Sequence, residues 1–254
     1  MNADERADVA QQFGVAPDQV ERDHLVSHLL AFLSQNLDNR IQFIGGTALA
    51  RTHLPDGRLS EDIDLIAIDD RRAVAADLDS ALPRALARTH GRLTLEPPLS
   101  GVADTGAAVL RSATGIVVRI QLLAARGRVL WPTERRFLQQ RYRDAPAAEL
   151  TVPTLPAFAA SKTATWADRH APRDLWDLWA LNRIGAIDPA ALKLYRRYGP
   201  TNQPPGSFVF ETPPSEAEWQ SQLAGQTRLT VDAADALAIV REAWARVIAA
   251  ERGN

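Results

Sequence analysis

The stretch FIGGTALARTHLPDGRLSEDIDLIAI, residues 43–68, decides the fold. The apolar run Ile41 to Ile44 predicts a short strand that ends at Gly45-Gly46. Thr47 to His53 then predicts one or two turns of helix, and a proline- and glycine-containing turn follows it. Asp62 to Ile68 alternates well enough to predict a second strand with one polar face.

Two carboxylates share the polar face of that second strand. Asp62 and Asp64 are two residues apart, so both side chains leave the same face and lie close enough to share one hard cation. Exposed acids on a strand face are the alternative, but like charges repel and the apolar neighbours imply a buried strand. A bound Mg²⁺ would offset the repulsion, so the pair predicts a magnesium site.

Gly45, Gly46 and Thr47 open the predicted short helix. Backbone amides at such a helix start can cradle a nucleotide's phosphates, with the Thr47 hydroxyl assisting. A glycine pair after a strand is more often a tight turn, so these residues alone do not decide between the two. Arg58 and Ser60, in the turn before the acids, complete the candidate nucleotide-binding set of the first half.

The rest of the chain predicts an α/β first half and a mostly helical second half. Helices are expected at 18–37, 72–90, 157–169, 173–182, 189–197 and 232–251, and further strands at 93–95, 107–110 and 116–123. Strand signals fade beyond Trp131-Pro132, and residues 202–214 are proline-rich and predict a surface loop. We therefore expect domains at 1–150 and 151–254, with the second completing an active-site cleft.

Composition restricts the class of protein. The chain has 254 residues, 46% hydrophobic and 24% charged, and no cysteine, which fits a globular protein of the reducing cytoplasm and excludes thiolate metal sites. No signal-like or membrane-spanning apolar run is evident, so we expect a cytoplasmic protein with no membrane partner. A net charge of −2 argues against a protein that coats nucleic acid nonspecifically.

The combined pattern of strand, Gly-Gly-Thr and Arg58-x-Ser60-x-Asp62-x-Asp64 resembles the nucleotidyltransferase superfamily. In detail it is similar to the AbiEii/AbiGii toxin family, which includes the MenT toxins. A second motif of that family, a lysine followed by Arg-Asp-x-x-Asp, is present in SKTATWADRHAPRDLWDLWAL, residues 161–181. By itself this charged helix pair would equally fit a solvated face or a structural ion-pair network.

The resemblance implies a mixed-sheet nucleotidyltransferase domain of the α/β (α+β) class followed by a helical domain. It implies a toxin that uses Mg²⁺ to add nucleotides from an NTP to the 3′ acceptor end of tRNA until a cognate antitoxin intervenes. The implied catalytic residues are Asp62, Asp64, Lys162, Asp174 and Asp177, with Asp62 and Asp64 as metal ligands. The implied nucleotide-binding residues are Gly45, Gly46, Thr47, Arg58, Ser60, Lys162 and Arg173.

One departure from the superfamily pattern keeps alternatives open. Many nucleotidyltransferases carry a third carboxylate on a later strand, where GIVVRIQLLAAR offers Arg119 and Gln121. Either two acids suffice, or Asp174 or Asp177 completes the site, or the enzyme is weakened. A transferase that modifies a protein or a small molecule, and a non-catalytic binding module, remain alternatives.

Three further groups of residues are weighed and set aside. His24 and His28 lie four apart on the first predicted helix, but no carboxylate partner is evident in the sequence, so we do not expect a metal there. Core packing is expected for the tryptophans near Lys162 rather than stacking on a base. Two arginine clusters offer a path for an RNA backbone or simply face water: Arg135, Arg136, Arg141 and Arg143, and Arg196 with Arg197.

Overall fold

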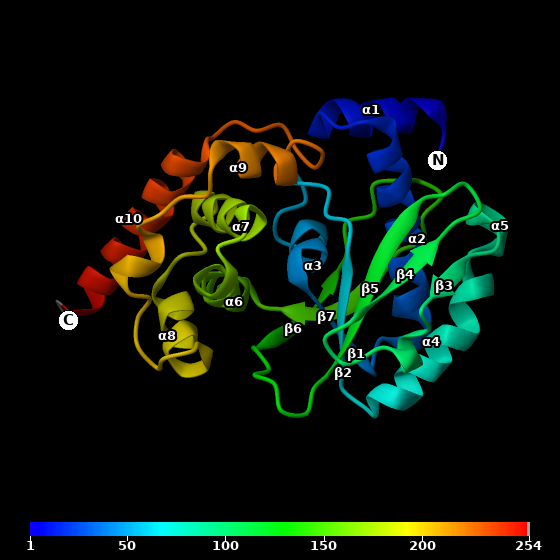
Figure 1. The fold of residues 1–254 in the computed structure, drawn as a ribbon, viewed down its shortest axis with the longest axis horizontal. Helices are drawn as coiled ribbons and strands as arrows, with labels where there is room; N and C mark the ends of the chain where they lie inside the picture. Colours follow the sequence, from blue (N-terminus) through cyan, green and yellow to red (C-terminus); the bar gives the residue numbers. More distant parts are fainter. Residues whose placement is uncertain (253–254) are drawn as a thin grey trace. The chain divides into compact units, whose positions relative to one another are not determined.

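The computed structural model describes residues 1–252, which divide into two compact units. Unit 1 comprises residues 1–129 and 134–152, and unit 2 comprises residues 130–133 and 153–254. Unit 1 carries the sheet and unit 2 is helical (Figure 1). Among the residues that the structure describes, no helix is both long enough and apolar enough to cross a membrane.

A five-stranded mixed sheet forms the centre of unit 1. Its order is β1-β2-β5-β4-β3, with bounds β1 Ile41–Ile44, β2 Ile63–Ala67, β3 Thr94–Glu96, β4 Ala107–Arg111 and β5 Val117–Ala124. Only the β2–β5 pair is parallel, and the other pairs are antiparallel. This mixed α/β architecture confirms the fold class expected from the sequence.

Helices cover the sheet of unit 1. They are α1 Ala3–Phe13, α2 Pro17–Leu37, α3 Gly45–Arg51, α4 Arg71–Ala85 and α5 Ala87–His90, with a 3₁₀ turn η1 at Leu99–Gly101. The helices α2 and α4 both contact β5, whereas α3 contacts β1 and β2 (Figure 1). The central strand β2 is buried at every position except Asp64, which is half-buried.

The short helix α3 is fastened from its C-terminal end by a buried charge network. Arg51 is 1% exposed and donates to Asp23 Oδ1 at 2.7 Å and to the carbonyl of Gln139 at 2.9 Å. The Tyr142 hydroxyl donates to the other oxygen of Asp23 at 3.0 Å. Burial lowers the pKa of Arg51 to about 10 despite the attraction of Asp23. The guanidinium therefore stays charged at neutral pH and holds α3 against α2.

Three elements differ from the sequence expectation. The polar N-terminal segment forms α1, which begins with a capping box between Asn2 and Glu5 and ends at Gly14 in the left-handed conformation. Its burial of only Val9 and Phe13 explains why no apolar periodicity revealed it. The expectation that strands end near residue 132 is also wrong, because β6 Thr133–Phe137 and β7 Glu149–Pro153 form a two-stranded sheet.

Unit 2 consists of helices packed around buried tryptophans. Its elements are α6 Leu155–Arg169, α7 Pro172–Arg183, α8 Pro189–Tyr198, η2 Ser207–Phe210, α9 Glu216–Leu223 and α10 Ala233–Arg252. Trp166 is fully buried and its indole donates to the carbonyl of Val209 at 2.9 Å. The predicted surface loop at 202–214 therefore needs correction, since Val209 and Phe210 are buried within it. The tryptophans near Lys162 form core, as expected.

Candidate functional site

The turn from β1 into α3 brings Gly45 against the carboxylate of Asp64. Ile44 pairs with Asp64 across the β1–β2 ladder, and Gly45 follows with a φ of +79°. A Cβ at Gly45 would lie 2.2 Å from Asp64 Oδ2, closer than any side chain tolerates. Glycine is therefore required twice, for its positive φ and for the space that the carboxylate occupies.

At Gly46 the absence of a side chain likewise leaves space, here for side chains of the turn that precedes β2. A Cβ there would lie 2.5 Å from Nη2 of Arg58 and 3.1 Å from Oγ of Ser60. Both partners are buried, with exposed fractions of 3% for Arg58 and 9% for Ser60. The structure thus gathers Arg58 and Ser60 beside Gly46, and their nucleotide-binding role stays a prediction.

The Thr47 side chain has an internal partner. Its hydroxyl donates to the backbone carbonyl of Asp62, and the residue is 1% exposed. This bond ties the first turn of α3 to the residue that enters β2. Thr47 therefore positions Asp62. Its assistance in binding the phosphates stays a prediction.

Asp62 and Asp64 lie on either side of buried Ile63 and are themselves half-buried. Alternation along the extended chain places both carboxylates on one face. Two carboxylates on one face form a hard oxygen donor set, which suits Mg²⁺. The residues present in unit 1 therefore fit a divalent cation of the kind that the fold family implies.

No third acid joins this pair in the part of the chain that the structure describes, where the only group of three or more potential metal ligands lies elsewhere. The position beside Asp64 in the parallel ladder is Gln121. Its amide donates to the carbonyl of Thr105 at 2.7 Å, so the side chain is used within the fold. Gln121 thus occupies the position beside Asp64 at which many nucleotidyltransferases carry a third carboxylate.

In unit 2, the second motif forms a buried ion-pair network. Lys162 Nζ lies 2.9 Å from Asp174 Oδ1 and 2.6 Å from Asp177 Oδ2. Arg169 Nε donates to the other oxygen of Asp174 at 2.6 Å. Both acids are at most 2% exposed. Burial would raise the pKa of Asp174, but the two cations hold it well below its usual value, at about 2.

Arg173 lies at the start of α7, next to Asp174, and is half-buried. Lys162, Asp174 and Asp177 therefore come together as the sequence motif implies, and the lysine pairs with both acids. Their predicted catalytic role and the phosphate role of Arg173 stay predictions. The contacts show that the three residues also stabilise unit 2.

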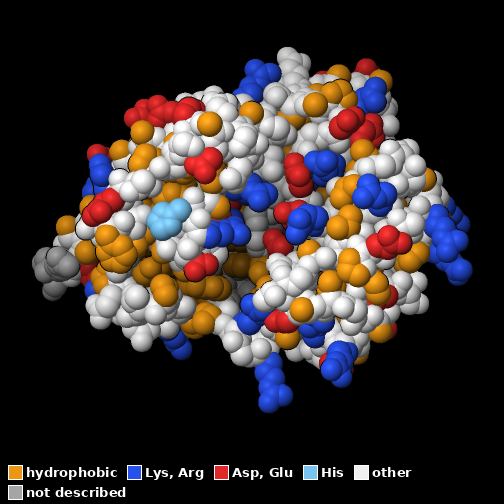
Figure 2. Space-filling model, viewed as in Figure 1, with side chains coloured by type: hydrophobic (Ala, Val, Ile, Leu, Met, Phe, Trp, Pro, Cys, Tyr) orange, Lys and Arg blue, Asp and Glu red, His pale blue; other side chains and the backbone are white. Residues whose placement is uncertain are grey.

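The arginine clusters separate into buried and exposed members. Arg141 is buried and donates to the carbonyls of Ala50 and Pro55, so it does not offer a path for RNA. Arg135 pairs with Asp38 and Glu149 on the surface. Figure 2 shows cationic and acidic side chains interspersed on the viewed face. This mixture agrees with the small net charge of the chain.

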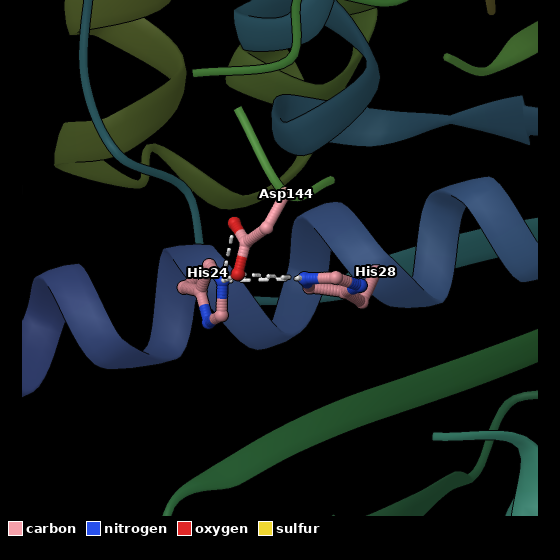
Figure 3. Close-up of side chains that lie close together, drawn as sticks. All are labelled: His24, His28 and Asp144. Atoms are coloured by element: carbon pink, nitrogen blue, oxygen red, sulfur yellow. Dashed lines mark hydrogen bonds and ion pairs between the residues drawn. The ribbon is translucent and has the colours of Figure 1, made fainter. Parts of the chain in front are cut away.

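A second cluster of potential ligands was missed by the sequence analysis. His24 and His28 of α2 lie beside Asp144, so the expectation that they lack a carboxylate partner is wrong (Figure 3). Asp144 and His90 lie 120 and 66 residues from His24, and no local spacing connects them. Burial is the largest cause that lowers the pKa of His28, and it lowers that of His90 to about 4.

Comparison with known proteins identifies the family of the chain. The family model of the nucleotidyl transferase AbiEii toxin, type IV toxin–antitoxin system, matches residues 29–250. The chain belongs to the AbiEii nucleotidyltransferase toxin family. It is thus a nucleotidyl transfer enzyme of a type IV toxin–antitoxin system, for which the family implies an NTP substrate and a cognate antitoxin.

One solved structure, that of MenT4, agrees with this family assignment. MenT4, a nucleotidyltransferase toxin from Mycobacterium tuberculosis H37Rv, is 25% identical, with a TM-score of 0.71 over 96% of this chain and 89% of its own. An antigenic nucleotidyltransferase-like protein from Paracoccidioides brasiliensis is 17% identical, with a TM-score of 0.40 over 63% of this chain and 76% of its own. A search of curated protein sequences gave no significant match.

The AbiEii glycine pair gives the first prediction. Gly45→Ala should displace the Asp64 carboxylate and lower nucleotidyl transfer at least about tenfold, because the new methyl group occupies the position of Oδ2. Gly127→Ala is the matched control, since Gly127 has a φ of +78° but nothing within 4 Å of its Cβ position. Both variants carry the same backbone strain of about 1 kcal/mol. Transfer rates that fall equally in the two variants would show that strain, and not displacement of Asp64, is responsible.

The ion-pair network of unit 2 gives the second prediction. Lys162→Met leaves Asp174 and Asp177 facing each other in the interior, which should lower the free energy of unfolding of unit 2 by about 3–5 kcal/mol. All six tryptophans lie in unit 2, so tryptophan fluorescence during urea unfolding reports this unit.

Two comparisons make this prediction specific. Lys193→Met removes the other lysine of the chain, which is exposed, and should change stability little. The pKa of Asp174 is lower in the folded than in the unfolded state. Its contribution to the free energy of unfolding is therefore present above about pH 4 and is lost as the pH falls towards 2. Lys162→Met should therefore show a weaker loss of stability across this range than wild type. Equal acid sensitivity in the two proteins contradicts the network.

Proposed function

We propose that this AbiEii-family chain uses Mg²⁺ held by Asp62 and Asp64 to transfer nucleotides from an NTP to the 3′ acceptor end of tRNA. The observation that carries the proposal is the packing of the Gly45 backbone directly against the Asp64 carboxylate. This contact places the main chain of the β1–α3 turn, without a side chain, directly beside the Asp64 carboxylate. Blocked aminoacylation would then explain toxicity.

The residues of unit 1 have distinct roles in this proposal. Asp62 and Asp64 would hold the cation, which when bound neutralises negative charge on the triphosphate. Arg58, buried beside Gly46, supplies a fixed positive charge for phosphate oxygens. The main-chain amides at the start of α3 add hydrogen-bond donors. Thr47 keeps Asp62 in place through its carbonyl.

The chemistry of transfer requires positioning more than acid–base catalysis. The oxygen of a 3′ hydroxyl attacks the α-phosphorus, the bond to the β-phosphate oxygen breaks, and pyrophosphate leaves as the hydroxyl loses its proton. Fixed charges around the α-phosphate lower the barrier because they need no reorganisation during the reaction. The buried setting of Arg58 and Ser60 supports such preorganisation.

The acceptor is inferred from similarity to the toxin family and from the requirement for an attacking hydroxyl. A tRNA acceptor places the reaction in the cytoplasm. Lys162 and Arg173 would contribute to phosphate binding, with Asp174 and Asp177 holding the lysine in position.

One observation favours a different function: Gln121 stands beside Asp64 where many nucleotidyltransferases carry a third acid. A module that binds a partner without catalysis is therefore the second candidate.

Incubation with total tRNA, Mg²⁺ and each α-³²P-labelled NTP tests the proposal. Wild type should label tRNA, and Asp62→Asn or Asp64→Asn should lower labelling more than about 100-fold, since even outer partners of metal ligands contribute about 10–100-fold. The matched control is Asp69→Asn, which removes an exposed acid just beyond β2 that pairs with Arg40. Activity of this variant should equal that of wild type.

The remaining outcomes select among the alternatives. Label on protein alone overturns tRNA as the acceptor and favours modification of the antitoxin or of the chain itself. Absence of label with every NTP, in protein that folds normally, favours the non-catalytic module. Labelling that survives both acid substitutions contradicts the assignment of Asp62 and Asp64.

A further inference from the structure

Three side chains that are distant in sequence meet beside α2 in unit 1. His24 and His28 lie one helical turn apart and point to the same side of α2, and Asp144 approaches them from the connection between β6 and β7 (Figure 3). Both histidines are at most 6% exposed, whereas the Asp144 side chain is 40% exposed. The half-exposed carboxylate thus lies between the buried imidazoles and solvent.

The distances match those of a tetrahedral metal centre. His24 Nε2 lies 3.2 Å from His28 Nε2 and 3.1 Å from Asp144 Oδ2, and His28 Nε2 lies 3.8 Å from the same oxygen. A tetrahedral ion with bonds of about 2.1 Å separates its ligand atoms by about 3.4 Å. The distances between the three atoms are therefore compatible with one shared ion.

The hydrogen bonds behind His24 orient its ring for metal binding. His90 Nδ1 lies 3.0 Å from the Thr89 hydroxyl, and its Nε2 lies 3.0 Å from His24 Nδ1. If His90 donates to Thr89, its Nε2 accepts the Nδ1 proton of His24, and the lone pair of His24 Nε2 then faces the cluster. Histidine ligands of metals are typically held by such a second hydrogen bond.

With His24 in this tautomer, its lone pair and the Asp144 carboxylate are both acceptors, so they face each other at 3.1 Å only with a proton or a cation beside them. The α-amino group of Met1 is a cation at this position, paired with Asp144 and 3.4 Å from His24 Nε2. It faces the same carboxylate oxygen as the two imidazoles. A metal ion that binds the three side chains would take the place of this amino group.

We propose that His24, His28 and Asp144 bind one Zn²⁺ ion. Two imidazoles and one carboxylate are a zinc ligand set, whereas Mg²⁺ prefers oxygen ligands and remains with Asp62 and Asp64. The site is separate from the proposed catalytic pair and does not depend on the proposed function.

The zinc ion has a structural role in this arrangement. It connects α2 to the 138–145 segment and, through His90, to α5. Asp23 and Tyr142, each within two residues of a ligand, fasten Arg51 of α3, whose first turn carries the glycine pair. Zinc therefore stabilises the support of the catalytic turn, and its removal should lower the melting temperature of unit 1.

The test uses untagged full-length protein stripped of metal by a chelator. Zn²⁺ is titrated in competition with a chromophoric chelator, and Co²⁺ is titrated separately for the visible absorption of a tetrahedral centre. Wild type should bind one Zn²⁺ per chain, and His28→Ala and Asp144→Ala should each weaken this binding at least about tenfold. Circular dichroism verifies that each variant folds.

Matched variants locate the ion. His53→Ala removes another largely buried imidazole of unit 1 and should leave zinc binding unchanged. Asp62→Asn combined with Asp64→Asn should also leave it unchanged. Failure of wild type to bind zinc, unaltered affinity in both His28→Ala and Asp144→Ala, or loss of zinc only in the Asp62/Asp64 variant overturns the proposal. Absence of tRNA labelling by wild-type protein that binds zinc would instead count against the proposed function alone.

Discussion

The contact between the Gly45 backbone and the Asp64 carboxylate is the constraint on which the rest of the site depends. It exists because β1 and β2 are antiparallel neighbours, so that the end of one strand meets the polar position of the other. The chain then turns into α3 with a positive φ, which glycine adopts without strain. The placement of the Asp64 carboxylate beside the main chain of the turn follows from this close approach.

Buried charges elsewhere in the chain have structural partners, and this distinguishes their roles. In unit 1, Arg51 and Asp23 fasten α3 to α2. In unit 2, Lys162 and Arg169 neutralise Asp174. Such pairs are costly to break because one partner is left charged in the interior. The half-buried acids on β2 differ from them in exposure, which suits a site that binds and releases substrate.

Local patterns made part of this structure predictable. The strand, glycine pair, short helix and acidic strand depend on residues close in sequence, so alternation and turn residues were sufficient to predict them. The lysine motif of unit 2 was also evident, because Lys162 and Asp174 lie on consecutive helices. Family resemblance added the function, which no residue pattern alone provides.

Nonlocal features were not predictable. The strand β6 was missed because exposed residues such as Phe137 and Arg136 fill it and give no alternation. Its partner β7 was missed although its burial alternates. The histidine cluster was missed because Asp144 reaches α2 only through the folded chain. The most direct measurement of the central claim is electron paramagnetic resonance of Mn²⁺, titrated with a nonhydrolysable NTP analogue into wild type and into the Asp62→Asn/Asp64→Asn double variant. The account predicts that the double variant binds one Mn²⁺ ion per chain fewer, and equal stoichiometry and affinity in the two proteins would contradict it.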